Sequence, residues 1–233
     1  MATLNQQRGT VLQVMNDVAR RMGFGPFASV SANQTSLTWA GYLNDVLAEV
    51  SDYGDWPQLY EEVVASAQGG QGIVEVNASA PVRRVMEVHF GSSRAALNEM
   101  DVSQWRQLSR SSALAAGGPR QWALVDTSGI NPRLRVYPTP STAAASARYN
   151  IACYTQPRLY GSADAAAQLP FSRPLLVNGL FARTLTDEST FQMTQQAQAV
   201  FTLFRTQLRE EYNRNVSDAG AGTVTLKVPN LWR

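Results

Sequence analysis

Apolar residues recur at three- and four-residue spacings near the start of the chain, which is typical of amphipathic helices. The first such stretch runs from about Arg8 to Met22 and is followed by glycines and a proline. The second follows the polar run 33–36, whose side chains can cap unpaired backbone amides, and ends near Gly54 and Pro57. We therefore expect two helices in the first 58 residues.

The pattern changes between Leu59 and Pro157, where short runs alternate in polarity or are rich in β-branched and aromatic residues. The expected strands cover residues 59–67, 72–77, 81–91, 121–126, 133–138 and 147–155. Glycine, proline and asparagine separate them, as turns require. Six strands at this spacing predict an antiparallel sandwich or a partly closed sheet.

One helical stretch interrupts the strands, over residues 100–110. Its Val102, Trp105 and Leu108 share one face. We expect a short helix lying across the sheet.

Helical spacing returns after Pro170. Residues 173–185 predict one helix, and residues 187–215 predict a long one that Asp187 or Ser189 could cap. The long helix would turn five residues toward the core: Ala197, Phe201, Phe204, Leu208 and Tyr212.

The last segment, 218–233, opens with small residues and then alternates apolar and polar positions, as an extended arm does. The predicted fold class is α+β. Residues 1–58 and 170–217 form a small helical bundle, residues 59–169 insert an antiparallel β-sandwich-like domain, and residues 218–233 form an extended C-terminal arm.

Composition and charge add limits to this picture. The chain has 233 residues, of which 44% are apolar, so it can form one large core or two small ones. Its net charge of +2 gives no strong argument for nucleic acid, membrane or acidic substrates. Lys227 is the only lysine, so 19 of the 20 basic residues are arginines. A GC-rich genome explains this bias as well as a need for guanidinium contacts does.

The chain shows no signal-peptide pattern and no run of about 18 apolar residues. A single cysteine excludes a disulfide within the chain. We expect a soluble protein that is made in the cytoplasm.

Candidate catalytic residues are few. The only histidine, His89, lies in an expected strand in which Met86, Val88 and Phe90 would share one face and Glu87 and His89 the other. This alternation predicts an exposed or edge histidine beside Glu87.

The only cysteine, Cys153, alternates with Tyr149 and Ile151, which predicts a buried and unreactive thiol. A Cys153–His89 dyad is geometrically possible, but no motif supports it.

Acidic pairs and glycine-rich stretches add little chemistry. Glu61–Glu62, Glu210–Glu211 and Asp52 with Asp55 are expected on the solvated surface. The stretch "GGQG" lacks the lysine and the helix of a nucleotide-binding loop. With one histidine, one cysteine and no aspartate-rich loop, we expect no metal site, no cofactor and no catalytic residues.

The order of several motifs carries a family resemblance. A helix with an aromatic-proline turn, "LNDVLAEVSDYGDWPQL", precedes the strands "PRQWALVD", "LRVYPTP" and "ARYNIACYTQP". An "LPF" turn and a long amphipathic helix follow. From about Thr35 to Asn213, the chain resembles the head-to-tail adaptor (connector) proteins of tailed bacteriophages, also described as tail tubular proteins.

The resemblance implies a structural virion protein with no catalytic role. Such adaptors form rings, usually of twelve subunits, between the capsid portal and the tail, and DNA passes through the lumen. The implied partners are identical subunits, the portal protein, a downstream tail or nozzle protein and, transiently and non-specifically, double-stranded DNA. The implied location is the head–tail junction of the virion, assembled in the host cytoplasm, without membrane contact.

Two groups of residues are candidate interfaces under this interpretation. The arm would contact the portal or a neighbouring subunit through Val224, Leu226, Val228, Leu231 and Trp232; the alternative is an edge strand of the protein's own sheet. The expected ring-interface or lumen arginines on the last helix are Arg205, Arg209 and Arg214; the alternative is a solvated helix face.

Other functions also fit the predicted fold. The chain could be another phage tail component, such as a tail terminator or baseplate subunit. A carbohydrate-binding sandwich could use tryptophans as stacking platforms, with candidates at Trp39, Trp56, Trp105, Trp122 and Trp232. Core packing is the simpler explanation for Trp39 and Trp105, because both lie on apolar helix faces.

Overall fold

The computed structural model describes residues 8–67, 72–91, 95–110, 117–126, 131–140, 148–187, 192–193 and 195–218. Contacts divide them into two compact units. One unit comprises the described residues up to Gln58 and from Pro157 onward, and the other comprises Leu59–Gln156. The helices and antiparallel strands confirm the predicted α+β class.

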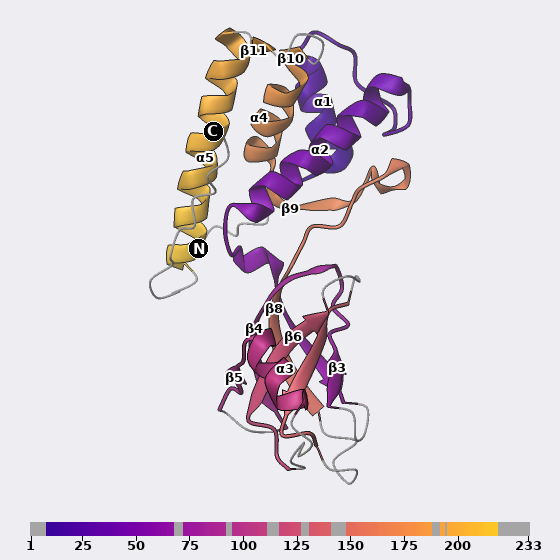
Figure 1. The fold of residues 1–233 in the computed structure, drawn as a ribbon. Helices are drawn as coiled ribbons and strands as arrows, with labels where there is room; N and C mark the ends of the chain where they lie inside the picture. The colour runs from indigo at the N-terminus through magenta and orange to yellow at the C-terminus, as the bar shows by residue number, and fades with distance from the viewer. Residues whose placement is uncertain are drawn as a thin grey trace. The chain divides into compact units, whose positions relative to one another are not determined.

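Four helices form the first unit, and α4 is at its centre. They are α1 (Val11–Arg21), α2 (Gln34–Asp52), α4 (Arg173–Thr184) and α5 (Gln195–Asp218). Figure 1 shows α4 between α5 on one side and α1 and α2 on the other, and α4 contacts all three. Every residue of α4 from Leu175 to Ala182 is buried. A helix buried all round is expected where neighbours cover each of its faces.

Reciprocal side-chain caps begin both N-terminal helices. The Thr10 hydroxyl accepts the Gln13 amide at 3.3 Å, while the Gln13 side chain accepts the Thr10 amide at 3.0 Å. Asn33 and Ser36 make the same exchange at the start of α2, at 2.9 and 3.0 Å. The capping role predicted for the polar run 33–36 is therefore confirmed.

An aromatic cluster lies beyond the end of α2. Trp56 is fully buried, and its indole nitrogen donates to the Val50 carbonyl at 2.6 Å. Its ring meets the rings of Phe171 and Tyr212 edge-on, with centroids 5.0 and 5.2 Å away. The aromatic-proline turn thus attaches the end of α2 to residues more than 100 positions later in the chain.

A short strand pair was missed by sequence analysis. β1 (Arg8–Thr10) pairs antiparallel with β9 (Gln168–Ser172), so the first helix begins at Val11 rather than Arg8. The expected "LPF" turn is wrong, because these residues lie in β9 with Leu169 and Phe171 buried. A three-residue strand is too short to produce a period in the sequence.

The chain returns from the β-rich unit to the helical unit after Gln156, whereas the sequence analysis placed this boundary after residue 169. The Asn44 side chain exchanges two hydrogen bonds with the backbone of Tyr160, both 3.0 Å long. The amides of Val11 and Leu12 donate to the Ala167 and Ala165 carbonyls, both at 3.2 Å. These bonds attach residues 157–167 to the helical unit, although their composition is that of a loop.

The long C-terminal helix begins later than predicted. It starts at Gln195 rather than Asp187, because β10 (Thr186–Asp187) pairs antiparallel with β11 (Gln192–Met193). Asp187 therefore does not cap α5, and Ser189 lies outside the described residues. The predicted core face is confirmed for Ala197, Phe204, Leu208 and Tyr212, while Phe201 is half-buried.

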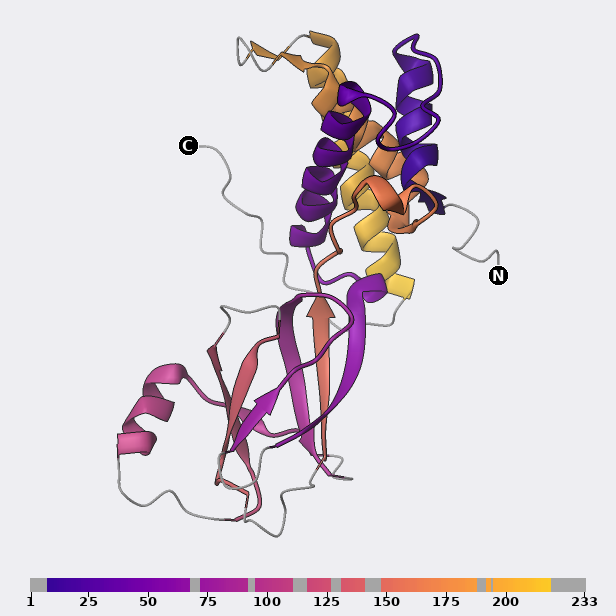
Figure 2. The same cartoon turned by 90° about the vertical axis from the view of Figure 1, so that its right-hand side faces the viewer.

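The second unit is a β-sandwich, as predicted (Figure 2). One sheet has the order β2-β8-β4 and the other β3-β7-β6-β5, with every pair antiparallel except β5–β6. The strands are β2 (Tyr60–Ser66), β3 (Ile73–Glu75), β4 (Val82–Phe90), β5 (Asn98–Glu99), β6 (Gln121–Asp126), β7 (Arg133–Tyr137) and β8 (Arg148–Thr155). Both sheets contribute to one core, which includes Val63, Ile151, Trp122 and Leu134.

The strand expected over residues 133–138 is confirmed as β7. The strand ends at Tyr137, before a cis peptide bond to Pro138, and its Leu134 and Val136 are fully buried. Proline has no amide to continue a ladder.

The helix α3 (Val102–Arg110) contacts β6. Its Val102, Trp105 and Leu108 are half-buried, while the other α3 residues with described side chains are exposed. The predicted apolar face is therefore the one turned toward the protein.

A register shift in β4 overturns one predicted face. Val85 pairs with Cys153 and Glu87 with Ala152, so Met86 is the extra residue of a β-bulge. Val85 and Val88 are buried, and Met86 is exposed. Met86 therefore does not share the inner face with Val88.

Candidate functional site

The cysteine and the histidine lie on opposite faces of the same sheet. Cys153 is fully buried, whereas His89 pairs with Asn150, an exposed position of β8. The predicted burial of the thiol is confirmed, and the Cys153–His89 dyad is wrong because the sheet separates the two groups. His89 instead lies 3.1 Å from Glu87, measured from Nε2 to Oε2, as predicted.

Burial changes the chemistry of the thiol. Desolvation, together with the charge of Glu61, raises the pKa of Cys153 to about 11. The thiol also donates to the Glu61 carbonyl oxygen at 3.6 Å. A thiol held protonated in this way is a weak nucleophile.

Two of the acidic pairs hold local structure. Glu61 accepts hydrogen bonds from the Ser79 amide and hydroxyl at 3.0 and 2.6 Å. Glu211 is half-buried rather than solvated, and accepts from the amide and hydroxyl of Ser172 at the start of α4. A carboxylate is favourable at a helix N-terminus.

Among the described residues, no group of three or more histidine, cysteine, aspartate or glutamate side chains could hold a metal ion. Within the same residues, no helix combines the length and the apolar character needed to cross a bilayer.

Most tryptophans are core residues. Trp39, Trp56 and Trp122 are at most 5% exposed, so none offers a ring to a sugar. Trp105 is half-buried and Trp232 lies outside the described residues. The carbohydrate-binding alternative thus loses three of its five platforms.

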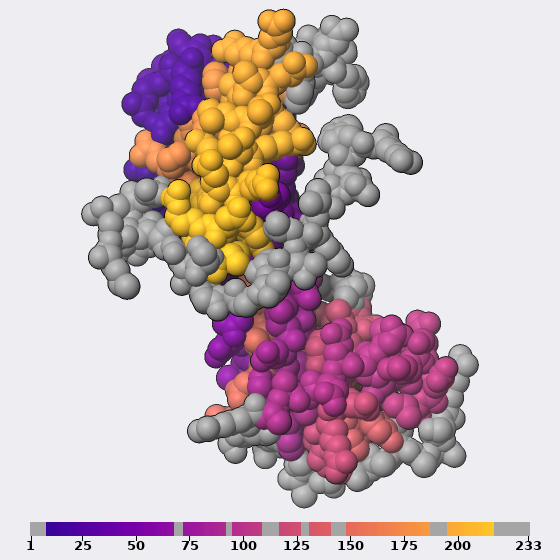
Figure 3. Space-filling view, turned by 90° about the vertical axis from the view of Figure 1, so that its left-hand side faces the viewer, coloured from indigo at the N-terminus to yellow at the C-terminus, as the bar shows by residue number. Residues whose placement is uncertain are grey.

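The candidate arginines on α5 are exposed. Arg205 and Arg209 lie one turn apart on one side of the buried stripe, and Arg214 lies on its other side, given about 100° per residue. The Arg205 guanidinium lies 4.6 Å from the centre of the Phe201 ring. Figure 3 shows α5 along one face of the helical unit. The candidate arm residues Val224, Leu226, Val228, Leu231 and Trp232 lie outside the described residues.

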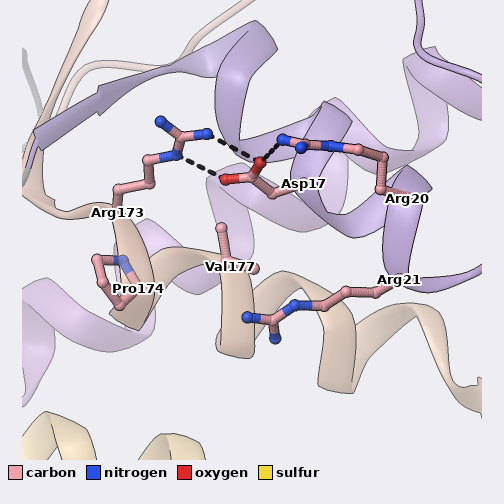
Figure 4. Close-up of a pocket in the computed structure, with 6 residues that line it drawn as sticks. All are labelled: Asp17, Arg20, Arg21, Arg173, Pro174 and Val177. Carbon is pink, nitrogen blue, oxygen red and sulfur yellow. Dashed lines mark hydrogen bonds and ion pairs between the residues drawn. The ribbon is translucent and has the colours of Figure 1, made fainter.

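A second arginine cluster was missed by sequence analysis. A pocket of about 350 Å³ opens between α1 and α4 (Figure 4). Its lining consists of Asp17, Arg20, Arg21, Arg173, Pro174 and Val177. We call it the arginine pocket.

Asp17 holds two of these arginines in place. Its carboxylate accepts two hydrogen bonds from Arg173, at 2.6 Å from Nε and 2.8 Å from Nη2, and a third from Arg20. Burial acts to raise the pKa of Asp17, but the hydrogen bonds and charges of Arg173 and Arg20 outweigh it and lower the pKa. Gly9 gives the Arg173 stem room, because a Cβ there would lie 2.9 Å from Arg173 Cδ.

Arg21 is held by neutral groups. Its Nη1 donates to the Asn178 side chain at 2.6 Å, and its guanidinium lies 5.8 Å from the centre of the Phe181 ring. Asn178 in turn donates to Gln207 of α5 at 2.6 Å. Among the described residues, no carboxylate forms an ion pair with Arg21.

The local sequence contained one clue to this pocket, the i,i+3 spacing of Asp17 and Arg20. Arg173 lies 156 residues from Asp17, so only the fold brings it there.

One protein family matches nearly the whole chain. The family model described as SU10 adaptor protein matches residues 9–227. The chain belongs to the SU10 adaptor family. The match includes almost all described residues of both units, so it does not rest on one motif. No curated protein sequence matches the chain significantly.

Membership of the SU10 adaptor family confirms the coarser part of the resemblance found in the sequence. The protein is a phage structural adaptor and therefore a virion component that interacts with other head or tail proteins. The α5 arginines and the arginine pocket are exposed cationic surfaces of the helical unit.

Proposed function

We propose that this SU10 adaptor family member forms a homo-oligomeric ring of about twelve subunits at the head–tail junction of the virion. The ring joins the capsid portal to a downstream tail or nozzle protein and lets DNA pass through its lumen. The observation that carries the proposal is the family match over residues 9–227.

Two faces of the helical unit support the proposal of a ring. A closed ring uses heterologous contacts, so each subunit needs two different faces. In this unit, α5 and α1 lie on different sides of α4 (Figure 1). Each side exposes arginines, at Arg205 and Arg209 on α5 and at Arg20 and Arg21 on α1.

Contact with DNA would be weak and non-specific. The net charge of the chain is only +2, and the exposed α5 arginines are few. Guanidinium–phosphate contacts of this kind depend on salt and carry no sequence information. Such contacts suit DNA that moves through a lumen.

The C-terminal arm belongs to the proposal as a partner contact. We propose that Val224, Leu226, Val228, Leu231 and Trp232 contact the portal or a neighbouring subunit. A short alternating segment with a terminal aromatic side chain gains affinity by adding a strand or an anchor to a partner.

Co-expression with the portal protein of the same phage tests this function. We expect the adaptor to co-purify as a ring, with the mass of the assembly measured by native mass spectrometry and its symmetry by electron microscopy. A chain that ends at Gly220 should lose portal binding while keeping its circular dichroism spectrum. A protein that stays monomeric with the portal and is absent from purified virions would contradict the proposal.

A further inference from the structure

The arginine pocket carries more positive charge than its own acidic residue neutralises. Three guanidinium groups and one carboxylate line it, which leaves a net formal charge of +2. Asp17 is engaged by Arg173 and Arg20, and Arg21 has only neutral partners among the described residues. Arg21 is exposed, and an exposed guanidinium without a counter-charge can bind an anion through charge-assisted hydrogen bonds.

The guanidinium groups are already held in position. Asp17 orients Arg173 and Arg20, while Asn178 and the Phe181 ring orient Arg21. Each guanidinium has five N–H donors in a planar fork, and these bonds use only some of them. An incoming anion therefore meets donors whose side-chain freedom these contacts already reduce.

The remaining lining is apolar. Pro174 is exposed at the start of α4, while Val177, one turn further along between the arginines, is buried (Figure 4). The volume of about 350 Å³ suits one acidic side chain together with a neighbouring apolar one. The pocket thus combines charge recognition with a hydrophobic surface.

We propose that the arginine pocket binds an aspartate or glutamate side chain on a segment of a partner protein, next to an apolar residue that packs on Pro174. The carboxylate forms bidentate hydrogen bonds with Arg21 and with the outward N–H groups of Arg20. This surface is distinct from the C-terminal arm and from the α5 arginines.

A protein carboxylate fits the pocket better than a DNA phosphate does. Asp17 lies among the arginines and repels a chain of phosphates, whereas one carboxylate leaves the pocket with a formal charge of +1. DNA-binding surfaces spread their cations along the backbone, but here they converge on one point. The phosphate backbone also supplies no apolar group for Pro174.

Nuclear magnetic resonance on the ¹⁵N-labelled full chain tests the inference. The probe is the acetylated and amidated hexapeptide Gly-Leu-Glu-Glu-Leu-Gly, and the control probe has both glutamates replaced by glutamine. We expect the acidic peptide alone to shift the amides of residues 17–21 and 173–177 and the arginine Nε–H signals. The double change Arg20→Gln with Arg21→Gln should weaken binding at least about tenfold, since hydrogen bonds between charged groups are lost.

The matched control is Arg205→Gln with Arg209→Gln, which removes two exposed arginines from α5. It should leave the peptide dissociation constant within about twofold. If the pocket double variant does not fold, the single change Arg20→Gln replaces it. This variant should fold, because the Arg20 side chain is 67% exposed.

Four results would overturn the inference. The first is the absence of any amide shift at millimolar acidic peptide, and the second is a glutamine peptide that causes shifts as large as those of the acidic peptide. The third is an α5 control variant that loses as much peptide binding as the pocket double variant. The fourth is a short DNA duplex that shifts the pocket amides while the peptide does not. None of these results bears on ring formation, so this test and the portal co-expression fail independently.

Discussion

Gly179 is a position on α4 where side chains of two neighbouring helices approach the backbone closely. A Cβ built there would lie 2.6 Å from Val46 of α2 and 2.8 Å from the Phe204 ring of α5. Both neighbours are fixed in the core, so the collision cannot be relieved by a surface side chain. The central helix needs glycine here because of packing rather than backbone conformation.

Replacement of Gly179 by alanine should destabilise the helical unit by about 1–3 kcal/mol, the usual range for overpacking. Chemical denaturation followed by circular dichroism measures the change.

Gly41 provides the matched control. It also lies inside a helix, but its Cβ would meet nothing within 4 Å, so alanine there should stabilise the protein by up to about 1 kcal/mol. Equal effects at both positions would show that helix propensity dominates and that the close packing at Gly179 is unimportant.

At the residue scale, the alternation of apolar and polar positions predicted the sheet face of some side chains and not of others. Cys153 was placed correctly because β8 is regular around it, and His89 because β4 is regular from Glu87 onward. Met86 was not, because one extra residue in β4 shifts the period and leaves no mark in composition. The arginine pocket could not be predicted, because it depends on a contact between Asp17 and Arg173 that only tertiary packing creates.

The ion pair between Asp17 and Arg173 links α1 to α4 at the scale of elements. Burial acts against the charged form of Asp17, but the arginines favour it more strongly. The pKa of Asp17 is therefore lowered below its ordinary value of 3.8. A carboxyl with a lowered pKa in the folded state stabilises the fold above its unfolded pKa. The stabilisation is lost as the pH falls through the folded pKa.

The change Asp17→Asn should therefore cost about 1–2 kcal/mol at pH 7, with a modest value expected because Arg173 is partly exposed. The difference in melting temperature between wild type and variant should shrink as the pH falls below about 4. Thermal denaturation over this pH range measures it.

Asp45→Asn removes a negative charge from an exposed position of α2 and serves as the control. A difference that stays constant down to the most acidic pH at which the protein folds would contradict a role for the ionised Asp17.

Helices were predicted well in type and less well at their ends. The apolar period identified all four helices of the bundle, and the polar run before α2 marked its cap. The start of α5 was placed eight residues early, because residues with helical spacing pair instead as β10 and β11. Local propensity yields to tertiary pairing where a short hairpin is more stable in its context.

At the scale of the whole molecule, the chain enters and leaves the β-sandwich at neighbouring positions. Tyr60 is paired with Tyr154, and the Thr155 hydroxyl donates to the Leu59 carbonyl at 3.2 Å. The sequence predicted an inserted β-rich segment, since its turn-rich pattern contrasts with the helices. It could not show that residues 157–167 bond to α1 and α2, because these bonds use loop backbone.

Residues 59–156 expressed alone should therefore fold into a sandwich with a cooperative thermal transition, because their core comes from these residues only. Circular dichroism and size-exclusion chromatography provide the measurement.

A fragment that ends at residue 169 is the matched control. It carries Gln168 and Leu169, the first two residues of β9, away from β1, and separates the buried Leu169 from the rest of the helical unit. It should be less soluble than the shorter fragment. Better behaviour of the longer fragment would mean that residues 157–169 belong to the sandwich.

The pairing of β2 with β8 also has a mechanical consequence. A load applied between Gln58 and Pro157 pulls two adjacent antiparallel strands apart from the same end. The hydrogen bonds between such strands run perpendicular to them, so they would break one after another rather than all at once. Under tension along the chain, the sandwich should therefore unzip at low force and extend by the length of its own residues.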